Sequence, residues 1–395
     1  MPEIGEIARV VHYIRKHLVG RTIKTCQAFE DDIVYGKVGC SATAFAKATE
    51  GRRVTGAAQQ GKYFWVTFDK PPHAVMHLGM TGWVKFNVED TAYYKQAKEE
   101  EGKEQEWPPR FMKFMWKCAA EKVDGVDKEV VEAAFVDGRR LGRIRLVDCE
   151  ADKIRQASPL KENGPDPVQD KDIVTVEWLK ALMQRKKVPI KALLLDQANL
   201  SGVGNWVADE VLYQARVHPE QYCNTFGDEQ IKTLHDALIG VCTLAVETLA
   251  DSKQFPADWI MKYRWDKGKK DANVLPNGEK IVHLKVGGRT SAIVPSRQKK
   301  TGAVAADVED EDADDALEEP AKGKKRKSKV EEDESEAEKP AKKGRGRKST
   351  ETNGVKEEEP DEETPAKKGR SAKATPTKAE KPATPGSRRS ARTRT

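Results

Sequence analysis

Aromatic residues stop near residue 300, and this break limits where the chain can fold. Residues 301–395 contain no Phe, Trp or Tyr, and they alternate acidic runs, such as residues 309–312, with basic runs, such as residues 324–327. A segment of this composition buries too little apolar surface to offset its conformational entropy. We therefore predict a disordered, charged tail over residues 301–395. The folded part is placed in residues 1–300, which can form one large or two small cores.

Net charge and a possible targeting signal give two weaker indications, one about the binding partner and one about the location in the cell. The tail carries 23 Lys and Arg against 23 Asp and Glu, so the net charge of +6 belongs to residues 1–300. That surplus fits a polyanionic partner without requiring one. Residues 322–329, KGKKRKSK, resemble a nuclear-localisation signal, and the alternative is a solvated charge block. We predict a nuclear protein whose tail contacts DNA, chromatin or import factors.

Cysteine spacing argues against a metal site. No two cysteines form a Cys-x-x-Cys pair, and the sequence shows no signal peptide and no apolar run of membrane length. We predict reduced thiols in an intracellular protein with no metal, no cofactor and no membrane association. A monomer is the expected state. The cysteines are Cys26, Cys40, Cys118, Cys149, Cys223 and Cys242.

Hydrophobic patterning predicts an α+β fold. Residues 3–19 have apolar side chains at helical spacing. Four later segments are β-branched and aromatic runs broken by Gly, Pro and Asp, as in the antiparallel strands of a sandwich. The polar residues 89–107 are predicted as an exposed loop or helical insert. The strand segments are residues 53–69, 74–88, 111–119 and 132–147.

The following part of the chain has a different pattern. A linker over residues 150–167 precedes a helical pattern that runs from residue 176 to residue 249. Residues 281–286 and 291–294 then read as two strands joined by a turn with paired glycines, which supply the positive φ angles of a tight turn. The sequence therefore predicts a helical domain followed by a hairpin.

The N-terminus carries the first candidate site. Removal of Met1 would leave Pro2 with a free secondary amine, which can attack a sugar or carbonyl carbon and form a Schiff base. Glu3 and Glu6 lie on one face of the predicted helix, where one carboxyl can donate a proton and the other can orient the substrate. The alternative is an ordinary helix start, with proline at the first position and glutamates in the first turn.

Two turns between predicted strands carry further candidates. Lys62 follows Gly61 and precedes an apolar strand, and on position alone a solvated lysine is favoured over one that projects into a cleft. Met80 lies between two glycines in HLGMTG, where a flexible apolar side chain can wedge between bases. His77, in the same motif, is predicted to be a hydrogen-bonded core histidine.

A third turn, DGRRLG, holds two adjacent arginines. The fork of Arg139 or Arg140 suits a guanine edge or a phosphate, and the alternative is a surface salt bridge to Asp137.

Residues 191–219, KALLLDQANLSGVGNWVADEVLYQARVHP, form the most specific single segment. We predict a helix over residues 190–197, a glycine turn over residues 202–205 and a second helix over residues 206–215. Backbone N–H groups at the turn and helix start can hold a phosphate, with Asn205 as the helix cap and a donor. The alternative is a helix hairpin with no ligand.

Together these motifs resemble the formamidopyrimidine-DNA glycosylase family, in particular its plant and fungal members. They occur in the family's order over about residues 2–300, and GVGN is similar to the helix-two-turn-helix segment that grips phosphates in this family. The matching pieces are PEIGEI, GK before an aromatic strand, HLGMTG, DGRRLG, GPDP, DQANLSGVGNWVADEVLYQARVHP and GGRTSAIVP.

The resemblance implies that the chain is divided into four parts. Residues 1–150 would be the catalytic domain, with an N-terminal helix and an antiparallel β-sandwich, and residues 151–253 the helix-two-turn-helix DNA-binding domain. Residues 254–300 would form a zincless finger hairpin in place of the four-cysteine zinc finger of bacterial members. Residues 301–395 are the tail.

The resemblance also assigns the chemistry. Pro2 would form the Schiff base with the sugar of the damaged nucleotide, Glu3 would assist the opening of the sugar ring, and Glu6 would help to position the substrate. Lys62 would hold the DNA backbone and assist elimination. Arg289 would bind the phosphate beside the lesion.

Five further residues would contact DNA. Met80 would fill the gap left by the flipped base, Arg139 would face the orphaned partner base, and Asn205 would share the phosphate with the finger arginine. Two positions depart from the family pattern. Leu141 stands where bacterial members have a wedge phenylalanine, and Lys113 stands where a histidine is expected.

The expected activity is that of a bifunctional DNA glycosylase and abasic-site lyase of base excision repair, acting on oxidised purines in damaged duplex DNA through β,δ-elimination. Residues 255–265 replace the loop that caps oxidised guanine in bacterial members, so we hypothesise a preference for formamidopyrimidines and hydantoins over 8-oxoguanine. One alternative is an endonuclease VIII-like enzyme for oxidised pyrimidines. The other is a non-catalytic DNA-binding or chromatin protein, which has no need of an N-terminal amine.

Overall fold

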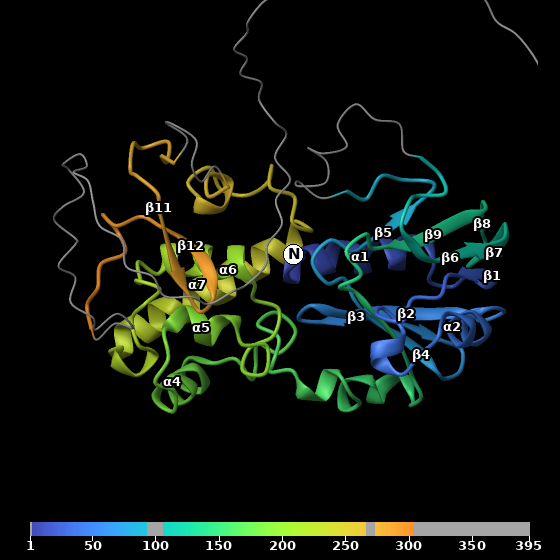
Figure 1. Ribbon diagram of the computed structural model, residues 1–395, viewed down its shortest axis with the longest axis horizontal. Coiled ribbons are helices and arrows are strands. Elements are labelled where there is room, and N and C mark those ends of the chain that lie inside the picture. The colour runs from blue at the N-terminus through green and yellow to red at the C-terminus, as the bar shows by residue number, and fades with distance from the viewer. Residues whose placement is uncertain (1, 93–105, 266–272, 303–395) are drawn as a thin grey trace, which may run out of the picture. The chain divides into compact units, whose positions relative to one another are not determined.

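The computed structural model describes residues 2–92, 106–265 and 273–302, which lie within one compact unit. Figure 1 shows the strands of residues 23–147 gathered on one side, the later helices and the last two strands on the other, and helix α1 (Ile4–His17) between them. The predicted tail, its basic segment and most of the predicted insert at residues 89–107 lie outside the described residues. No helix among the residues described is long and apolar enough to cross a membrane.

Two four-stranded antiparallel sheets form the predicted sandwich, with strand orders β1-β6-β9-β5 and β10-β4-β3-β2. Each predicted strand segment contains strands of these sheets, so this part of the α+β prediction is confirmed. The first sheet consists of β1 (Ile23–Ala28), β5 (Trp83–Phe86), β6 (Met112–Cys118) and β9 (Val131–Val136). The second consists of β2 (Val54–Gln60), β3 (Tyr63–Phe68), β4 (His73–His77) and β10 (Arg143–Val147).

Some elements of this half were not predicted. Strand β1 and helix α2 (Ala42–Thr49) lie in a stretch whose apolar residues follow neither a helical nor a strand period over a useful length. Helix α2 nevertheless buries Phe45, whose ring stacks on Trp116 at 5.8 Å between centroids. The short strands β7 (Glu121–Val123) and β8 (Val126–Lys128) form a separate hairpin.

Helix α1 serves two hydrophobic cores. Ile7, Val10 and Ile14, at helical spacing, are buried with the aromatic side chains of the sandwich, whereas Ile4 is buried among the helices of the other half. Gly5 lets the helix approach α7 (Asp228–Glu247), because a Cβ at this position would lie 2.6 Å from a backbone oxygen of that helix. The first turn of α1 therefore lies where the sheets meet the helices.

The second half is helical, as predicted, and ends in the predicted hairpin. Its core gathers apolar side chains around α6 and α7, and a smaller cluster lies under the hairpin. The helices are α4 (Val176–Gln184), α5 (Ile190–Leu195), α6 (Asn205–Gln214) and α7 (Asp228–Glu247), and the hairpin strands are β11 (Val282–Val286) and β12 (Arg289–Ile293). Short 3-10 turns lie at Gly36–Val38, Ala151–Gln156, Leu160–Glu162, Cys223–Thr225 and Ile260–Lys262.

A buried ionic network attaches the hairpin to the helices. The Asp209 carboxylate on α6 accepts a hydrogen bond from Lys191 Nζ at 2.5 Å, from Arg264 Nε at 3.1 Å and from the backbone N–H of Ala292 at 3.0 Å. Lys191 also donates to Ser291 Oγ at 2.6 Å. Two cations and one backbone N–H of the last strand thus converge on one carboxylate, and Lys191 links it to a second group of that strand. The hairpin is held by charge-assisted hydrogen bonds as well as by apolar packing.

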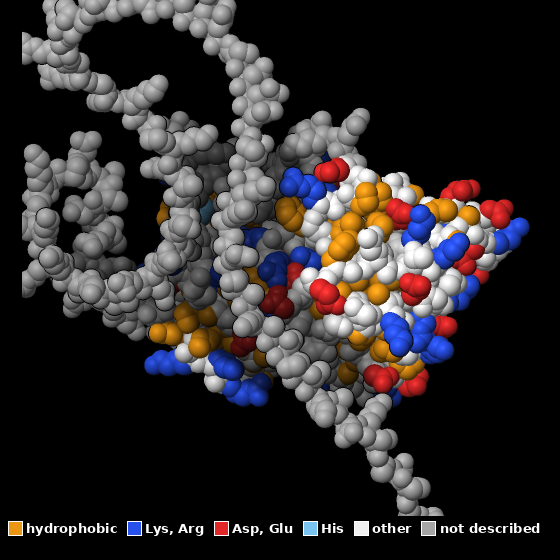
Figure 2. All heavy atoms as spheres, turned by 45° about the vertical axis from the view of Figure 1, so that its right-hand side comes forward, with side chains coloured by type: hydrophobic (Ala, Val, Ile, Leu, Met, Phe, Trp, Pro, Cys, Tyr) orange, Lys and Arg blue, Asp and Glu red, His pale blue; other side chains and the backbone are white. Residues whose placement is uncertain are grey.

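The strand half turns a mixed surface toward the viewer in Figure 2. Acidic and basic side chains alternate over this face, with hydrophobic groups between them. Interspersed charges of both signs produce no strong field over that face. That face therefore offers no patch of a single charge sign.

Candidate active site

The carboxylate of Glu3 binds the start of helix α6. Its Oε1 accepts the backbone N–H of Trp206 and its Oε2 accepts that of Val207, each at 3.0 Å. The first N–H groups of a helix lack partners within the helix, and the helix dipole favours a negative charge there. The side chain beside the predicted nucleophile is therefore fixed in place by a helix of the other half. Pro2 itself is buried.

This arrangement corrects one prediction about the glycine turn. The helix-start N–H groups that we expected to hold a phosphate carry Glu3 instead, and the N-cap is Gly204 rather than Asn205. Asn205 is the first residue of α6, and its Nδ2 donates to the carbonyl oxygen of Thr290 at 3.0 Å. The side-chain oxygen of Asn205 is buried and has no hydrogen-bond partner among the residues that the structure describes.

Glu6 lies directly beneath this contact. Its carboxylate accepts the backbone N–H of Glu3 at 3.0 Å and the indole N–H of Trp206 at 3.1 Å. Burial, reinforced by the nearby charge of Glu3, raises the pKa of Glu6 to about 7. A carboxyl with this pKa is present in both protonation states at neutral pH, so it can donate or accept a proton there.

Lys62 is buried, and the solvated position favoured from its place in a turn is wrong. The residue is only 6% exposed. Burial lowers its pKa, and the charge of Arg289 acts in the same direction, whereas the charges of Glu3 and Glu6 oppose the change. These four side chains therefore share one electrostatic environment, in which Lys62 gives up its proton more readily than an exposed lysine does.

Close backbone contacts bring Lys62 to this place. Gly61 has a φ of +59°, and a Cβ there would lie 2.6 Å from the backbone nitrogen of Gly202. The Gly61 N–H donates to Asp166 Oδ2 at 2.7 Å, in the GPDP linker. The turn between β2 and β3 is thereby held against both the linker and the glycine turn before α6.

Arg289 begins strand β12 and is exposed. Its neighbour Thr290 accepts the hydrogen bond of Asn205, and the hairpin turn approaches α5, because a Cβ at Gly287 would lie 3.2 Å from Ala192. The hairpin therefore brings the predicted phosphate-binding arginine to the same junction as the buried groups. The predicted catalytic residues Pro2, Glu3, Glu6, Lys62 and Arg289 thus come together, although they span nearly 290 positions of the chain.

Two further predicted residues, Met80 and Arg139, lie on turns at the same end of the second sheet. Tyr63, the residue after Lys62, pairs with His77 at the end of β4, and His77 also pairs with Arg143 at the start of β10. The turn that follows β4 carries a half-buried Met80, and the turn that precedes β10 carries an exposed Arg139. Strand register therefore groups both turns with Lys62.

The two turns touch each other closely. A Cβ at Gly79 would lie 2.4 Å from the carbonyl carbon of Leu141, and Leu141 is 38% exposed. Buried Asp137 accepts hydrogen bonds from Thr81 Oγ1 and from the N–H groups of Arg139 and Gly142. The alternative of a surface salt bridge to Asp137 is wrong, because backbone groups and a hydroxyl occupy that carboxylate.

His77 is the predicted core histidine. Its Nδ1 accepts the backbone N–H of Gly79 at 3.0 Å, and this bond supports the turn that carries Met80. Burial, followed by the charge of Lys62, lowers its pKa to about 4, so the ring is neutral at neutral pH.

Comparison with known proteins places these features in a family. Residues 1–144 match the model of the formamidopyrimidine-DNA glycosylase N-terminal domain, and residues 163–256 match that of the formamidopyrimidine-DNA glycosylase H2TH domain. The chain belongs to the formamidopyrimidine-DNA glycosylase family. This family consists of DNA glycosylases that act in base excision repair, and the resemblance inferred from the motifs is confirmed.

Individual relatives cover most of the folded part. Formamidopyrimidine-DNA glycosylase of Arabidopsis thaliana is 35% identical over 302 residues, which are 76% of this chain and 72% of that protein. The enzyme of Pediococcus pentosaceus is 30% identical over 247 residues, 62% of this chain and 78% of its own. The crystal structure of the Lactococcus lactis enzyme, bound non-covalently to DNA with an AP site, superimposes with a TM-score of 0.58 at 23% identity. That comparison covers 75% of this chain and 100% of the other.

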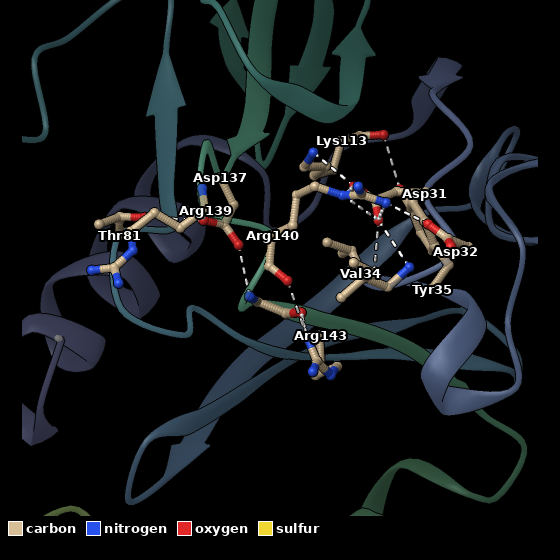
Figure 3. Close-up of polar contacts among 12 residues, drawn as sticks. Asp31, Asp32, Val34, Tyr35, Thr81, Lys113, Asp137, Arg139, Arg140 and Arg143 are labelled. Carbon is tan, nitrogen blue, oxygen red and sulfur yellow. Dashed lines mark hydrogen bonds and ion pairs between the residues drawn. The ribbon is translucent and has the colours of Figure 1, made fainter. Parts of the chain in front are cut away.

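Within this family fold, Lys113 and Arg140 meet at one buried carboxylate. Lys113 Nζ donates to Asp31 Oδ2 at 2.9 Å, and Arg140 Nε donates to the two Asp31 oxygens at 3.1 and 3.0 Å (Figure 3). Arg140 also pairs with Asp32. Of the two adjacent arginines, only Arg139 points away from this cluster in Figure 3. The ammonium of Lys113 is engaged by Asp31, and its contact with DNA stays a prediction.

The Asp31 cluster shapes the turn that carries Arg139 and Leu141. Burial raises the pKa of Asp31, but hydrogen bonds from Arg140 and Lys113 outweigh it and hold the pKa well below its usual range. Arg140 has a φ of +57°, an unusual backbone conformation for arginine, and its paired guanidinium anchors the turn.

Sequence reasoning missed several residues that support the candidate site. Trp206, Asp166, Asp209 and Asp31 all hold functional elements through buried hydrogen bonds. The one available signal was the short GPDP segment, whose aspartate had no assigned role. Among the residues that the structure describes, no group of three or more His, Cys, Asp or Glu is arranged to hold a metal ion. The metal-free finger itself stays a prediction.

Proposed function

We propose that the chain is a bifunctional DNA glycosylase and abasic-site lyase that forms a Schiff base through the amine of Pro2. The observation that carries this proposal is the junction around the N-terminus, where fixed Glu3, the residue after Pro2, shares one electrostatic environment with half-ionised Glu6 and buried Lys62. A structural helix start requires neither the fixed carboxylate nor the buried lysine. The amine is free once Met1 has been removed.

The proposed reaction replaces one C–N bond by another. The Pro2 nitrogen bonds to C1′ of the damaged nucleotide, the glycosidic bond breaks, and the departing base takes up a proton. Opening of the sugar ring then requires a proton on the ring oxygen and yields the iminium form of the Schiff base. Elimination of the 3′ and then the 5′ phosphate cleaves the strand, and hydrolysis of the Schiff base restores the amine.

The geometry supports a division of labour between the two carboxyl groups. The family resemblance assigns ring opening to Glu3, whose carboxylate here accepts two backbone N–H bonds, and such bonds stabilise the negative charge. Glu6, with a pKa of about 7, is the carboxyl that carries a proton at neutral pH. We therefore assign orientation and charge stabilisation to Glu3 and propose Glu6 as the proton reservoir.

Cationic and apolar residues would hold the extruded nucleotide and the gap that it leaves. Lys62, Asn205 and Arg289 meet at the junction and would bind the phosphate groups beside the lesion. A base inside the duplex must leave the stack before its glycosidic bond can be attacked. Met80 and Leu141 would fill the vacated space, with Arg139 toward the orphaned base.

The preferred substrates in this proposal are formamidopyrimidines and hydantoins, ahead of 8-oxoguanine. Support comes from Phe255 and Trp259, which are buried, with the Phe255 ring 5.7 Å from Trp206 and 4.8 Å from Trp259. Aromatic side chains packed into a core are not free to cap an extruded base. Single-turnover excision tests this preference, and comparable rates for 8-oxoguanine and formamidopyrimidine would contradict it. A panel of lesions that includes oxidised pyrimidines distinguishes this proposal from the endonuclease VIII-like alternative.

Borohydride trapping tests the main proposal. The protein with a free Pro2, the Pro2→Gly variant and a form with one extra N-terminal residue are each mixed with duplex DNA carrying an abasic site. We expect a covalent adduct with free Pro2 and none with the extended form. If correctly processed protein binds the duplex but yields no adduct, the non-catalytic alternative is favoured.

We also propose that the protein acts as a monomer in the nucleus and that residues 301–395 add import signals and non-specific DNA affinity. The basic run at residues 322–329 supports this role. Such affinity falls with salt, because cations compete for the phosphates. Deletion of residues 301–395 should reduce nuclear retention and the salt-dependent part of binding. Unchanged retention and binding would remove this role.

A further inference from the structure

Phe111 is an exposed aromatic residue that the proposed mechanism leaves unused. Its ring is 62% exposed, more than any other large hydrophobic side chain among the described residues. It directly precedes strand β6, whose first residue Met112 pairs with Val136 of β9. The fold gains little from this side chain, because most of the ring lies in solvent.

The backbone at Phe111 is also unusual. Its φ of +61° is a conformation that bulky side chains rarely adopt and that glycine adopts readily. The surrounding hydrogen bonds keep it there, since the Phe111 carbonyl accepts the N–H of Asp137 at 3.0 Å. Unfavourable conformations retained in a structure gather at binding and catalytic sites. An aromatic ring at a position suited to glycine therefore points to a role outside the fold.

The ring lies beside the turn that carries Arg139 and Leu141. A Cβ at Gly138 would lie 3.4 Å from the Phe111 ring, so the ring is in contact with that turn. Asp137, which fixes the Phe111 carbonyl, also fixes the N–H groups of Arg139 and Gly142 through its carboxylate. One buried aspartate thus positions both the exposed ring and the turn proposed to face the orphaned base.

The charge around the ring fits a nucleic acid. The Arg110 guanidinium lies over the ring, 5.4 Å from its centroid, and both side chains are exposed. The exposed guanidinium of Arg139 adds a second cation at the adjacent turn. Aromatic rings interleaved with arginines bind nucleic acids by stacking on bases while the cations contact phosphates. A protein partner for an apolar side chain would not call for two exposed cations beside it, neither of which forms an ion pair with a carboxylate among the described residues.

We propose that Phe111 is a DNA-binding residue that stacks on a base of the undamaged strand, next to the nucleotide that faces the lesion. This inference rests on the proposed function. It adds an aromatic contact at the turn where Leu141 replaces the family's wedge phenylalanine. Arg110 moves from the ring to a neighbouring phosphate when the base arrives. Stacking of one base is worth about 5- to 150-fold in affinity.

The test uses the full chain with a free Pro2 and a duplex that holds a tetrahydrofuran abasic analogue with 2-aminopurine next to the facing base. Phe111→Gly should weaken binding about tenfold and abolish the quenching of 2-aminopurine that stacking produces. Its thermal stability should be unchanged or raised, because glycine suits the positive φ. Phe111→Trp should retain affinity and quenching, and Ile173→Ala, at another exposed apolar position, is the matched control.

Several outcomes would overturn the inference while leaving the proposed function intact. These are Phe111→Gly binding within about twofold of the native protein, a large loss of stability in that variant, or a loss of self-association without a loss of DNA affinity. Borohydride trapping on single-stranded abasic DNA should be the same for native protein and Phe111→Gly. If the native protein itself fails to trap or bind, the proposed function fails first.

Discussion

The side chain of Glu3 occupies the space in which a side chain on Gly204 would begin. A Cβ at Gly204 would lie 2.1 Å from Glu3 Cδ, although the two residues are some 200 positions apart. The absence of a side chain in the glycine turn is therefore what admits the Glu3 carboxylate to the first N–H groups of α6. Its φ of −118° is open to any residue, so space alone explains this glycine.

Gly204→Ala should consequently disable the active site more than the fold. The new methyl group must displace Glu3, and a misplacement of this size costs about 100-fold in rate. Overpacking should lower the free energy of unfolding by about 1–3 kcal/mol. Single-turnover excision and chemical denaturation measure the two effects.

The control is Gly240→Ala, on the exposed face of α7, where a Cβ meets nothing within 4 Å. Alanine there should raise the free energy of unfolding by about 0.5–1 kcal/mol and leave the rate unchanged. Equal rates for both alanine variants would show that Glu3 tolerates displacement.

Asp209→Ala should be among the most damaging substitutions outside the active site. It leaves Lys191 and Arg264 buried without their shared carboxylate and removes the acceptor of the Ala292 N–H. Loss of one partner in a buried pair costs about 3–5 kcal/mol. Denaturation measures the loss, and faster hydrogen exchange in β12 should show that the hairpin loosens.

The matched control is Asp127→Ala, which breaks an exposed pair with Lys122 at 3.8 Å and should cost less than about 1 kcal/mol. Similar losses for the two variants would mean that the buried network does not anchor the hairpin.

Glu210 should make stability depend on pH. Burial, with the charges of Asp258 and Asp209, raises its pKa to about 8. Below about pH 4.5 the carboxyl is protonated in both the folded and the unfolded chain, but above it the unfolded chain releases the proton first. The free energy of unfolding therefore falls as pH rises from about 4.5 to 8.

Glu210→Gln removes this dependence while keeping the contacts. The oxygen of the new amide can accept the Met261 N–H. Its nitrogen can donate to Gln214 once the Gln214 side-chain amide has rotated so that its oxygen faces residue 210. Relative to the native chain, the variant should gain about 2–4 kcal/mol in free energy of unfolding between about pH 5 and about pH 8. Urea titrations at the two pH values measure it, with exposed Glu247→Gln as the control. A constant difference between variant and native chain would contradict the assignment.

Asp31→Asn should loosen the turn that carries Arg139 and Leu141. Asparagine keeps one acceptor oxygen, whereas its amide group would face the donors of Arg140 and Lys113. We expect a loss of about 1–3 kcal/mol in stability and about tenfold in excision from duplex DNA. Trapping on single-stranded abasic DNA should be retained, because that substrate has no orphaned base.

Asp32→Asn is the neighbouring control, because Asp32 is exposed and pairs with Arg140 alone in the described structure. If both variants lose duplex excision equally, the exposed pair rather than the buried carboxylate holds the turn.

Local pattern was sufficient for most strands of the two sheets and for the long helices, but not for strand β1, for helix α2 or for the burial of Lys62. The runs around β3 and β6 carry β-branched and aromatic residues, and their strands follow from period and composition. Lys62 looked solvated because its turn is polar on its own. It is buried through the contact of Gly61 with Gly202, a relationship between distant segments that no local window contains.

The helix cap of α6 shows the same limit. Asparagine is a residue type preferred at helix N-caps, and the sequence next to Asn205 offers no better candidate for the N-cap of α6. The capping carboxylate comes instead from Glu3, at the opposite end of the folded region. Asp31 and Asp209 were missed for a related reason. The structural role of each aspartate depends on cations from distant segments, which the neighbouring sequence does not reveal.

The Glu3–Trp206 contact also bears on how the protein is made. During synthesis Glu3 is incorporated 203 positions before Trp206, whose backbone N–H binds its carboxylate. Glu3 therefore emerges long before its binding place exists. The active site is completed only when the helical half has followed, so a truncated nascent chain cannot assemble the strand-cutting centre proposed for the finished protein.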